Sequence, residues 1–193
     1  MIQARTETSK TEIESKVSKV RGLIRFLKEL STVQSVDELM NLLRLEMRVF
    51  PQVKTPLLAS LTLQNTLRIH YFQGSQLLSK SSDQIWPQSS TIRSNDKKDS
   101  LYLANLFGRP FAKLVAVPLK VGSITAMLYF EHAFGEKDLS EFLKFLEARL
   151  QPVSIALDRL FLEGDLKDAS LLWERTFDSL QDPIAIFDNE GGL

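Results

Sequence analysis

The sequence contains no cysteine among its 193 residues. The absence of thiols excludes disulfides, thiolate nucleophiles, thiol redox switches and cysteine-ligated zinc sites. It equally excludes the thioether bond that attaches a bilin covalently, so no covalent bilin is expected, and the identity of any other cofactor stays open. Histidine is scarce too, with two residues, so a conventional zinc site would need carboxylate ligands and no metal site is expected.

Long apolar runs are also missing. No stretch approaches the roughly 20 residues that a membrane-spanning helix needs, and the polar start of the chain lacks the apolar core of a signal peptide. We therefore expect no membrane insertion and a cytoplasmic location. The chain has no excess of positive or negative charge either, because its 24 basic and 24 acidic residues give a net charge of zero. Nucleic-acid-binding proteins usually carry a basic excess or stripe, so we expect no nucleic-acid partner.

The motifs of common catalytic sites are absent as well. The chain has no phosphate-cradling Gly-x-x-x-x-Gly-Lys loop, no Gly-x-Gly-x-x-Gly fingerprint, no His-Glu-x-x-His and no Gly-x-Ser-x-Gly element. Its adjacent acidic residues Asp37 and Glu38 are explained by helix capping. We therefore expect no catalytic residue and no enzymatic activity in this chain. A self-contained enzyme is a further hypothesis, which turnover by the chain alone would support.

The first structural pattern in the sequence is a helical periodicity near the N-terminus. Apolar residues recur every three or four positions from residue 12 to about residue 32, which predicts a helix. One stripe has the four-three spacing of a coiled-coil seam and comprises Ile13, Val17, Val20, Ile24 and Leu27. A second stripe comprises Leu23, Phe26 and Leu30. We expect one stripe to face a partner helix and the other to face the domain.

A second helix and two hairpins are predicted next. Ser35, three residues before Glu38, predicts the start of the helix through a capping box. Two pairs of β-rich runs then predict hairpins, and the second pair is apolar nearly throughout, so we expect it to be central in the sheet. The four runs are residues 57–63, 67–72, 114–119 and 124–130. Residues 73–113 are less regular, and their polar stretches are expected to be exposed.

A long helix is predicted from Asp138 onwards. Its seam repeats at four-three spacing and comprises Leu139, Leu143, Leu146, Leu150, Val153, Leu157 and Leu160. Pro152 should kink or break the helix, whereas Phe142, Phe145 and Ile155 lie off the seam and are expected on the sheet. The two helices predict a parallel homodimer, with contacts at Ile13, Val17, Val20, Ile24, Leu146, Leu150, Val153, Leu157 and Leu160.

The second hairpin also carries a family resemblance. The pattern has four parts in order. An apolar strand ends in Pro-Leu, and a second strand ends in an apolar-aromatic run. A phenylalanine and then an acidic helix start follow. These parts are Leu114 to Leu119, Ile124 to Phe130, Phe134 and Asp138-Leu139. The pattern resembles a GAF domain over residues 35–160, although Ala126 stands where the family often has glycine. The resemblance implies an α/β (α+β) fold, with an antiparallel sheet, flanking helices and long N- and C-terminal signalling helices.

Residues 173–193 resemble the start of a PAS domain, with a helix, an Asp-Pro exit, one short strand and an acidic-Gly turn. One strand cannot bury a core, so we expect the chain to be a piece of a longer protein. The order GAF, helix, PAS is similar to that of sensor histidine kinases and of cyclic-di-nucleotide enzymes, and any kinase chemistry would lie beyond residue 193. The expected parts are a coiled-coil-like helix at 1–34, a GAF-like domain at 35–160, a helical linker at 161–180 and the PAS-like start at 181–193.

The resemblance also implies a place for a small-molecule ligand. GAF domains bind ligands on one side of the sheet, beneath the irregular middle segment. By that resemblance, the pocket would be lined by His70, Trp86, Tyr102, Phe107 and Phe111. The alternative is that these residues are ordinary core, and that His70 and His132 are solvated or satisfied.

The function implied is that of a regulatory sensory module in a signal-transduction protein, such as the sensor histidine kinase of a two-component system. It would relay a ligand-bound or conformational state through dimeric helices. Two alternatives stay open. One is a GAF-like dimerisation scaffold without a ligand, and the other is the regulatory domain of a cyclic-di-nucleotide enzyme.

Overall fold

The computed structural model describes residues 2–61, 66–82, 90–111, 113–122 and 124–179. Trp86 and the PAS-like segment 181–193 lie outside these residues. The chain forms two units, Met1–Asp158 and Arg159–Leu193, and each is described by itself. Within the described residues, no helix combines the length and the apolarity that a membrane span requires.

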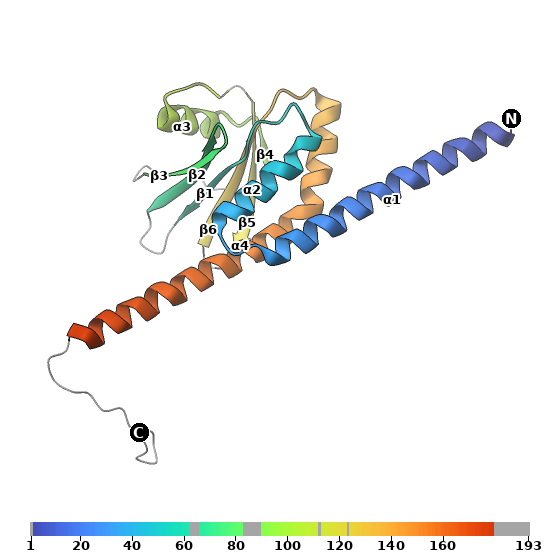
Figure 1. Ribbon diagram of the computed structural model, residues 1–193. Helices are drawn as coiled ribbons and strands as arrows, with labels where there is room; N and C mark the ends of the chain where they lie inside the picture. Colours follow the sequence, from blue (N-terminus) through green and yellow to red (C-terminus); the bar gives the residue numbers. More distant parts are fainter. Residues whose placement is uncertain (1, 62–65, 83–89, 112, 123, 180–193) are drawn as a thin grey trace, which may run out of the picture. The chain divides into compact units, whose positions relative to one another are not determined.

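The first unit holds a sheet and most of the helices (Figure 1). Its elements, in chain order, are α1 (Ile2–Thr32), α2 (Val36–Glu46), the 3-10 turn η1 (Met47–Val49), β1 (Leu57–Leu61), β2 (Leu67–Gln73), β3 (Gln76–Ser82), β4 (Arg93–Ser94), α3 (Lys97–Phe107), β5 (Leu114–Val121), β6 (Ile124–Glu131) and the first part of α4 (Glu136–Ser179). The chain is therefore a mixed α/β protein, as predicted.

The six strands form one antiparallel sheet in the order β3-β2-β1-β6-β5-β4. The two predicted hairpins, β1–β2 and β5–β6, are both present. Strand β1 joins them, because Ala59 pairs with Ile69 on one side and with Met127 on the other. Of the second hairpin, β6 is central, whereas β5 is bordered by the two-residue strand β4.

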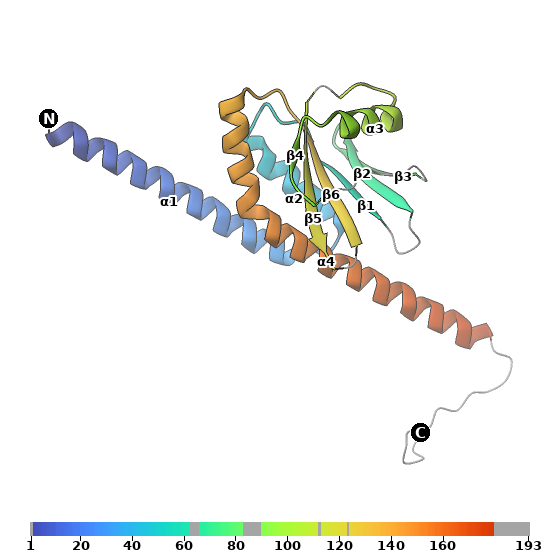
Figure 2. The same cartoon turned by 180° about the vertical axis from the view of Figure 1, so that it is seen from behind.

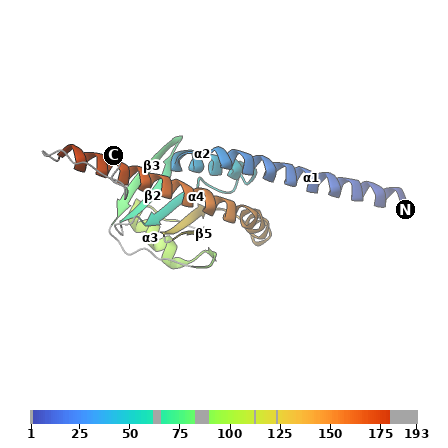
Figure 3. The same cartoon turned by 90° about the horizontal axis from the view of Figure 1, so that it is seen from below.

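Helices cover both faces of this sheet. Figure 2 and Figure 3 show α3 on one face, and α1, α2 and the first part of α4 on the other. Beneath α3, its residue Leu103 packs in a cluster with Ala59, Ile69 and Met127 of the strands. On the opposite face, the ring of Phe142 on α4 lies 5.5 Å from that of Phe130 on β6. The core is therefore divided into two layers by the sheet.

Two helix starts follow from local chemistry. The hydroxyl of Ser35 accepts a hydrogen bond from the Glu38 amide at 3.2 Å, so the predicted start of α2 is confirmed. The start of α3 was not predicted, because its polar first turn was expected to be an exposed loop. There, the Asp96 carboxylate accepts a hydrogen bond from the Lys98 amide at 2.7 Å, and Gly108 ends the helix at φ +64°.

Helix α4 continues through Pro152 instead of breaking. It bends in its first half (Figure 1), which is the behaviour that a proline inside a helix produces when it removes one backbone hydrogen bond. The described part of the second unit is the remainder of α4. There, several apolar side chains are exposed, and the rings of Trp173 and Phe177 stack with their centroids 5.8 Å apart.

Candidate functional site

Helix α1 presents apolar side chains to solvent on one side. Val17, Val20 and Ile24 are 43%, 56% and 61% exposed, and Leu27 is also exposed. The side chain of Ile13 lies outside the described residues. By contrast, Phe26 and Leu30 are buried. Phe26 and Leu30 of the second stripe are therefore buried and the first stripe is exposed, whereas the contact of the first stripe with a partner helix stays a prediction.

The predicted seam on α4 needs a correction. Leu146, Val153, Leu157 and Leu160 are buried, and Leu150 is half-buried. Ile155 was expected on the sheet but is exposed. The reason is that a heptad stripe can be buried within one chain as readily as between two, and most of this stripe is already buried. These seam residues are therefore not a free surface for a partner.

A buried ion pair joins α2 to α4 at the point where α1 also contacts them. The guanidinium of Arg149 donates hydrogen bonds to the Glu46 carboxylate at 3.1 Å, and both side chains are buried. Arg25 on α1 approaches the other oxygen of Glu46 at 3.4 Å. Burial lowers the pKa of Arg149, and the nearby Glu46 carboxylate opposes that shift. One carboxylate thus contacts cations from two helices.

Aromatic rings surround the same guanidinium. Arg149 lies over the Phe145 ring at 3.6 Å and over the Phe26 ring at 5.3 Å. Such contacts stabilise a cation that has lost part of its hydration. Because Phe26 belongs to α1, a displacement of α1 would change the surroundings of Arg149 on α4.

The predicted ligand-lining residues are divided between the two faces of the sheet. Beneath α3, Tyr102 and Phe111 are buried in the core, and the Phe107 ring makes edge contacts with Tyr71 at 4.9 Å and with Phe111 at 5.9 Å. His70 alternates with residues Ile69 and Tyr71 of that cluster, so it lies on the opposite face. Trp86 lies outside the described residues. The structure therefore brings together Tyr102, Phe107 and Phe111, without His70.

The surroundings of His70 agree with that placement. Burial and the nearby Arg68 lower the pKa of His70, while Asp37 on α2 acts in the opposite direction. His132, the other histidine, is buried, and its Nδ1 accepts a hydrogen bond from the Phe134 amide at 3.2 Å. No group of three or more potential metal-ligating side chains occurs among the described residues.

One buried acid in the first turn of α3 was not predicted. Asp99 is 1% exposed, and one of its oxygens accepts a hydrogen bond from Arg93 at 2.7 Å and one from the Tyr129 hydroxyl at 3.5 Å. Burial raises the pKa of Asp99, which Arg93 partly offsets. Its Oδ2 atom has no hydrogen-bond partner within the described residues. The only sequence signal was a polar run, which equally describes an exposed loop.

No protein-family profile matches the chain, and a search of curated proteins finds no significant match.

Proposed function

We propose that the chain is a GAF-like regulatory module of a signal-transduction protein, in which two copies pair through α1 and pass a conformational state from α1 to α4. The observation on which this rests is the two-sided α1 helix. Phe26 and Leu30 attach it to the domain, while Val17, Val20 and Ile24 point apolar surface away. A helix with two apolar stripes has surface for two partners, and the domain occupies one of them.

A second copy of the same helix is the partner that fits the exposed stripe. Val17, Val20, Ile24 and Leu27 follow the three-four spacing of a coiled-coil seam, and identical stripes are self-complementary in a two-fold pair. Pairing would remove this apolar surface from water, which stabilises association by about 25 cal/mol for each Å² buried. Parallel pairing would place equivalent domains side by side.

The buried ion pair supports a role in relaying movement. Glu46 contacts Arg25 on α1 and Arg149 on α4, so the three helices meet at one carboxylate. A buried charge that loses its partner is costly, which favours a few discrete arrangements over a continuous range. A rotation of α1 in a paired state would therefore be felt at α4 through Glu46 and Phe26.

The longer protein that would contain this module is of the kind that the sequence resemblance implies. The element order of two helices, a hairpin, a middle segment, an apolar hairpin and a long helix supports a GAF-like module. Within a longer protein, α4 would lead toward a PAS-like segment, as in a sensor histidine kinase or a cyclic-di-nucleotide enzyme. The module itself would perform no chemistry.

The pairing is tested by measuring the mass of the protein in solution by light scattering and sedimentation. We expect a dimer for the unchanged chain and at least a tenfold weaker dimer for Ile24→Asp, since a charge would enter the seam. Ser18→Asp is the matched control, because it adds the same charge at an exposed position of α1 off the stripe. A monomeric parent chain, or equal masses for the two variants, would contradict the proposal.

A dimerisation scaffold without a ligand is the second candidate function. The observation in its favour is that buried side chains such as Tyr102 and Phe111 fill the face beneath α3. Native mass spectrometry of the purified chain separates the two functions. A dimer with additional bound mass supports ligand sensing, and a dimer of bare polypeptide mass that no added metabolite stabilises against heat supports the scaffold.

A further inference from the structure

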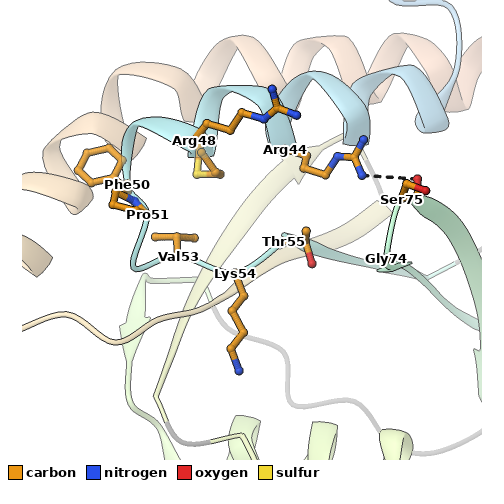
Figure 4. Close-up of a pocket in the computed structure, with 10 residues that line it drawn as sticks. Arg44, Arg48, Phe50, Pro51, Val53, Lys54, Thr55, Gly74 and Ser75 are labelled. Atoms are coloured by element: carbon orange, nitrogen blue, oxygen red, sulfur yellow. Dashed lines mark hydrogen bonds between the residues drawn. The ribbon is translucent and has the colours of Figure 1, made fainter.

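A hollow with a basic lining lies on the opposite side of the sheet from α3. It has a volume of about 560 Å³ and is bounded by the end of α2, by η1, by the segment before β1 and by the turn between β2 and β3 (Figure 4). Small-molecule sites usually have volumes of about 300–1,000 Å³. The hollow is therefore large enough for a small metabolite.

The charge of the lining is of one sign. Arg44, Arg48 and Lys54 line the hollow, and no acidic side chain joins them in the part of the chain that the structure describes. Arg44 lies in the last turn of α2, and Arg48 lies in the 3-10 turn η1 that follows it. Two like charges that line one hollow repel each other, and an anion bound between them would remove that repulsion.

Arg44 is held in place but has unused donors. Its guanidinium lies over the Phe72 ring at 4.5 Å, and Nη1 donates one long hydrogen bond of 3.5 Å to the Ser75 carbonyl (Figure 4). Its Nε is buried and has no hydrogen-bond partner among the described residues. A guanidinium offers five donors in a planar fork that matches a carboxylate or phosphate, so an oxyanion would satisfy it.

The two other cations differ from each other. Arg48 is exposed and has no ion pair or hydrogen bond with any residue that the structure describes. Lys54 donates a hydrogen bond to Glu131 at 2.8 Å, and Figure 4 shows it extending away from the arginines. Glu131 is also bound by Arg109 at 3.0 Å, so one carboxylate serves two cations. The arginines are thus the groups available to an anion.

The remaining lining is largely apolar. Met47, Phe50, Pro51 and Val53 form part of the wall next to the arginines. We propose that this hollow binds a small organic anion, in which a phosphate or carboxylate group contacts Arg44 and Arg48 and an apolar or aromatic body rests against that wall. The site does not depend on pairing through α1, and it lies on the α2 side of the sheet, away from the face beneath α3.

The test is titration calorimetry of the full chain with phenyl phosphate, benzoate and the uncharged analogue phenol, at fixed ionic strength. We expect at least one of the two anions to bind with a dissociation constant below about 1 mM and at least tenfold more tightly than phenol. Binding of phenyl phosphate alone assigns a phosphate ligand, and binding of benzoate alone assigns a carboxylate. If neither anion binds more tightly than phenol, the proposal is overturned.

Substitutions locate the site. Arg48→Gln should weaken anion binding at least tenfold, and it should leave the fold intact because Arg48 has no partner to lose in the described chain. Arg44→Gln should weaken binding at least as much, with circular dichroism used to confirm folding. Arg175→Gln, which removes the same charge elsewhere, should bind like the parent. Unchanged binding by Arg48→Gln, or equal weakening by Arg175→Gln, would place the anion elsewhere and overturn the proposal.

Discussion

The carboxylate of Glu46 on α2 lies 3.1 Å from the guanidinium of Arg149 on α4, although 103 positions separate the two residues in the chain. Both side chains are buried, so this contact replaces hydration that each charge would have had in the unfolded chain. A pair of this kind favours the few positions of α4 against α2 in which both charged groups keep their hydrogen bonds.

Loss of the cation should therefore be costly. We expect Arg149→Met to lower the free energy of unfolding by about 3 kcal/mol, since it leaves Glu46 buried with Arg25 alone for a partner. Lys19→Met breaks a pair whose side chains are 73% and 66% exposed, so it should cost less than about 1 kcal/mol. Urea denaturation of both variants measures the difference.

The double variant Glu46→Leu/Arg149→Met identifies the cause of that loss. Replacing both charges with apolar side chains should recover most of the stability, because no uncompensated buried charge remains. A double variant as unstable as Arg149→Met alone would mean that packing, rather than the unpaired charge, explains the loss.

Helix α4 should show a sharp contrast between neighbouring positions. Leu157 is 0% exposed and Ile155 is 64% exposed. Leu157→Ala should lower the free energy of unfolding by about 2–5 kcal/mol, whereas Ile155→Ala should change it by less than about 0.5 kcal/mol. Chemical denaturation tests this contrast. Equal effects would mean that α4 does not direct its heptad stripe toward its own domain.

Stability should decrease in mild acid. Burial, and secondarily the positive charge of Lys113, lowers the pKa of His132 below 6.5 in the folded protein. The unfolded chain then binds a proton at a higher pH than the folded protein does. The free energy of unfolding therefore decreases as the pH falls from about 6.5 toward the lower pKa of the folded protein. His132→Asn should reduce this loss, measured as the urea midpoint between about pH 5 and pH 8. A variant with the parent's pH dependence would exclude His132 as its source.

Two glycines should respond to alanine with opposite signs. Gly122 has φ +50°, and a Cβ there would lie 2.9 Å from the Asp158 carboxylate, so Gly122→Ala should cost about 1–2 kcal/mol. Gly22 lies within α1 with open space around its Cα, so Gly22→Ala should stabilise the protein by about 0.5–1 kcal/mol. Thermal melting of the two variants compares them directly, and a shift in the same direction would contradict this account.

Local patterns were enough to predict the elements that short-range chemistry determines. The Ser35 cap and both hairpins could be read from the sequence. The two-sided character of α1 also followed from spacing, because the two stripes occupy different sides of the helix.

Long-range relationships could not be predicted in the same way. The heptad spacing that includes Leu146 and Leu157 is the same whether the stripe meets a partner helix or the chain's own sheet, and here it is buried within the chain. The contact of Glu46 with Arg149 and the burial of Asp99 depend on which elements meet in space. Spacing along one segment does not contain that information.

The two-residue strand β4 leaves most of the outer edge of β5 uncovered in the described part of the chain, since it pairs with Val115 and Ala116 alone. Pro118 lies further along that edge, and a proline is tolerated in a paired strand where its nitrogen faces away from the ladder. An incoming strand would therefore miss a donor there. At the other edge, β3 presents polar residues that include Lys80. Both edge strands therefore have features that discourage pairing with a strand of another chain, which is the step by which fibrils grow.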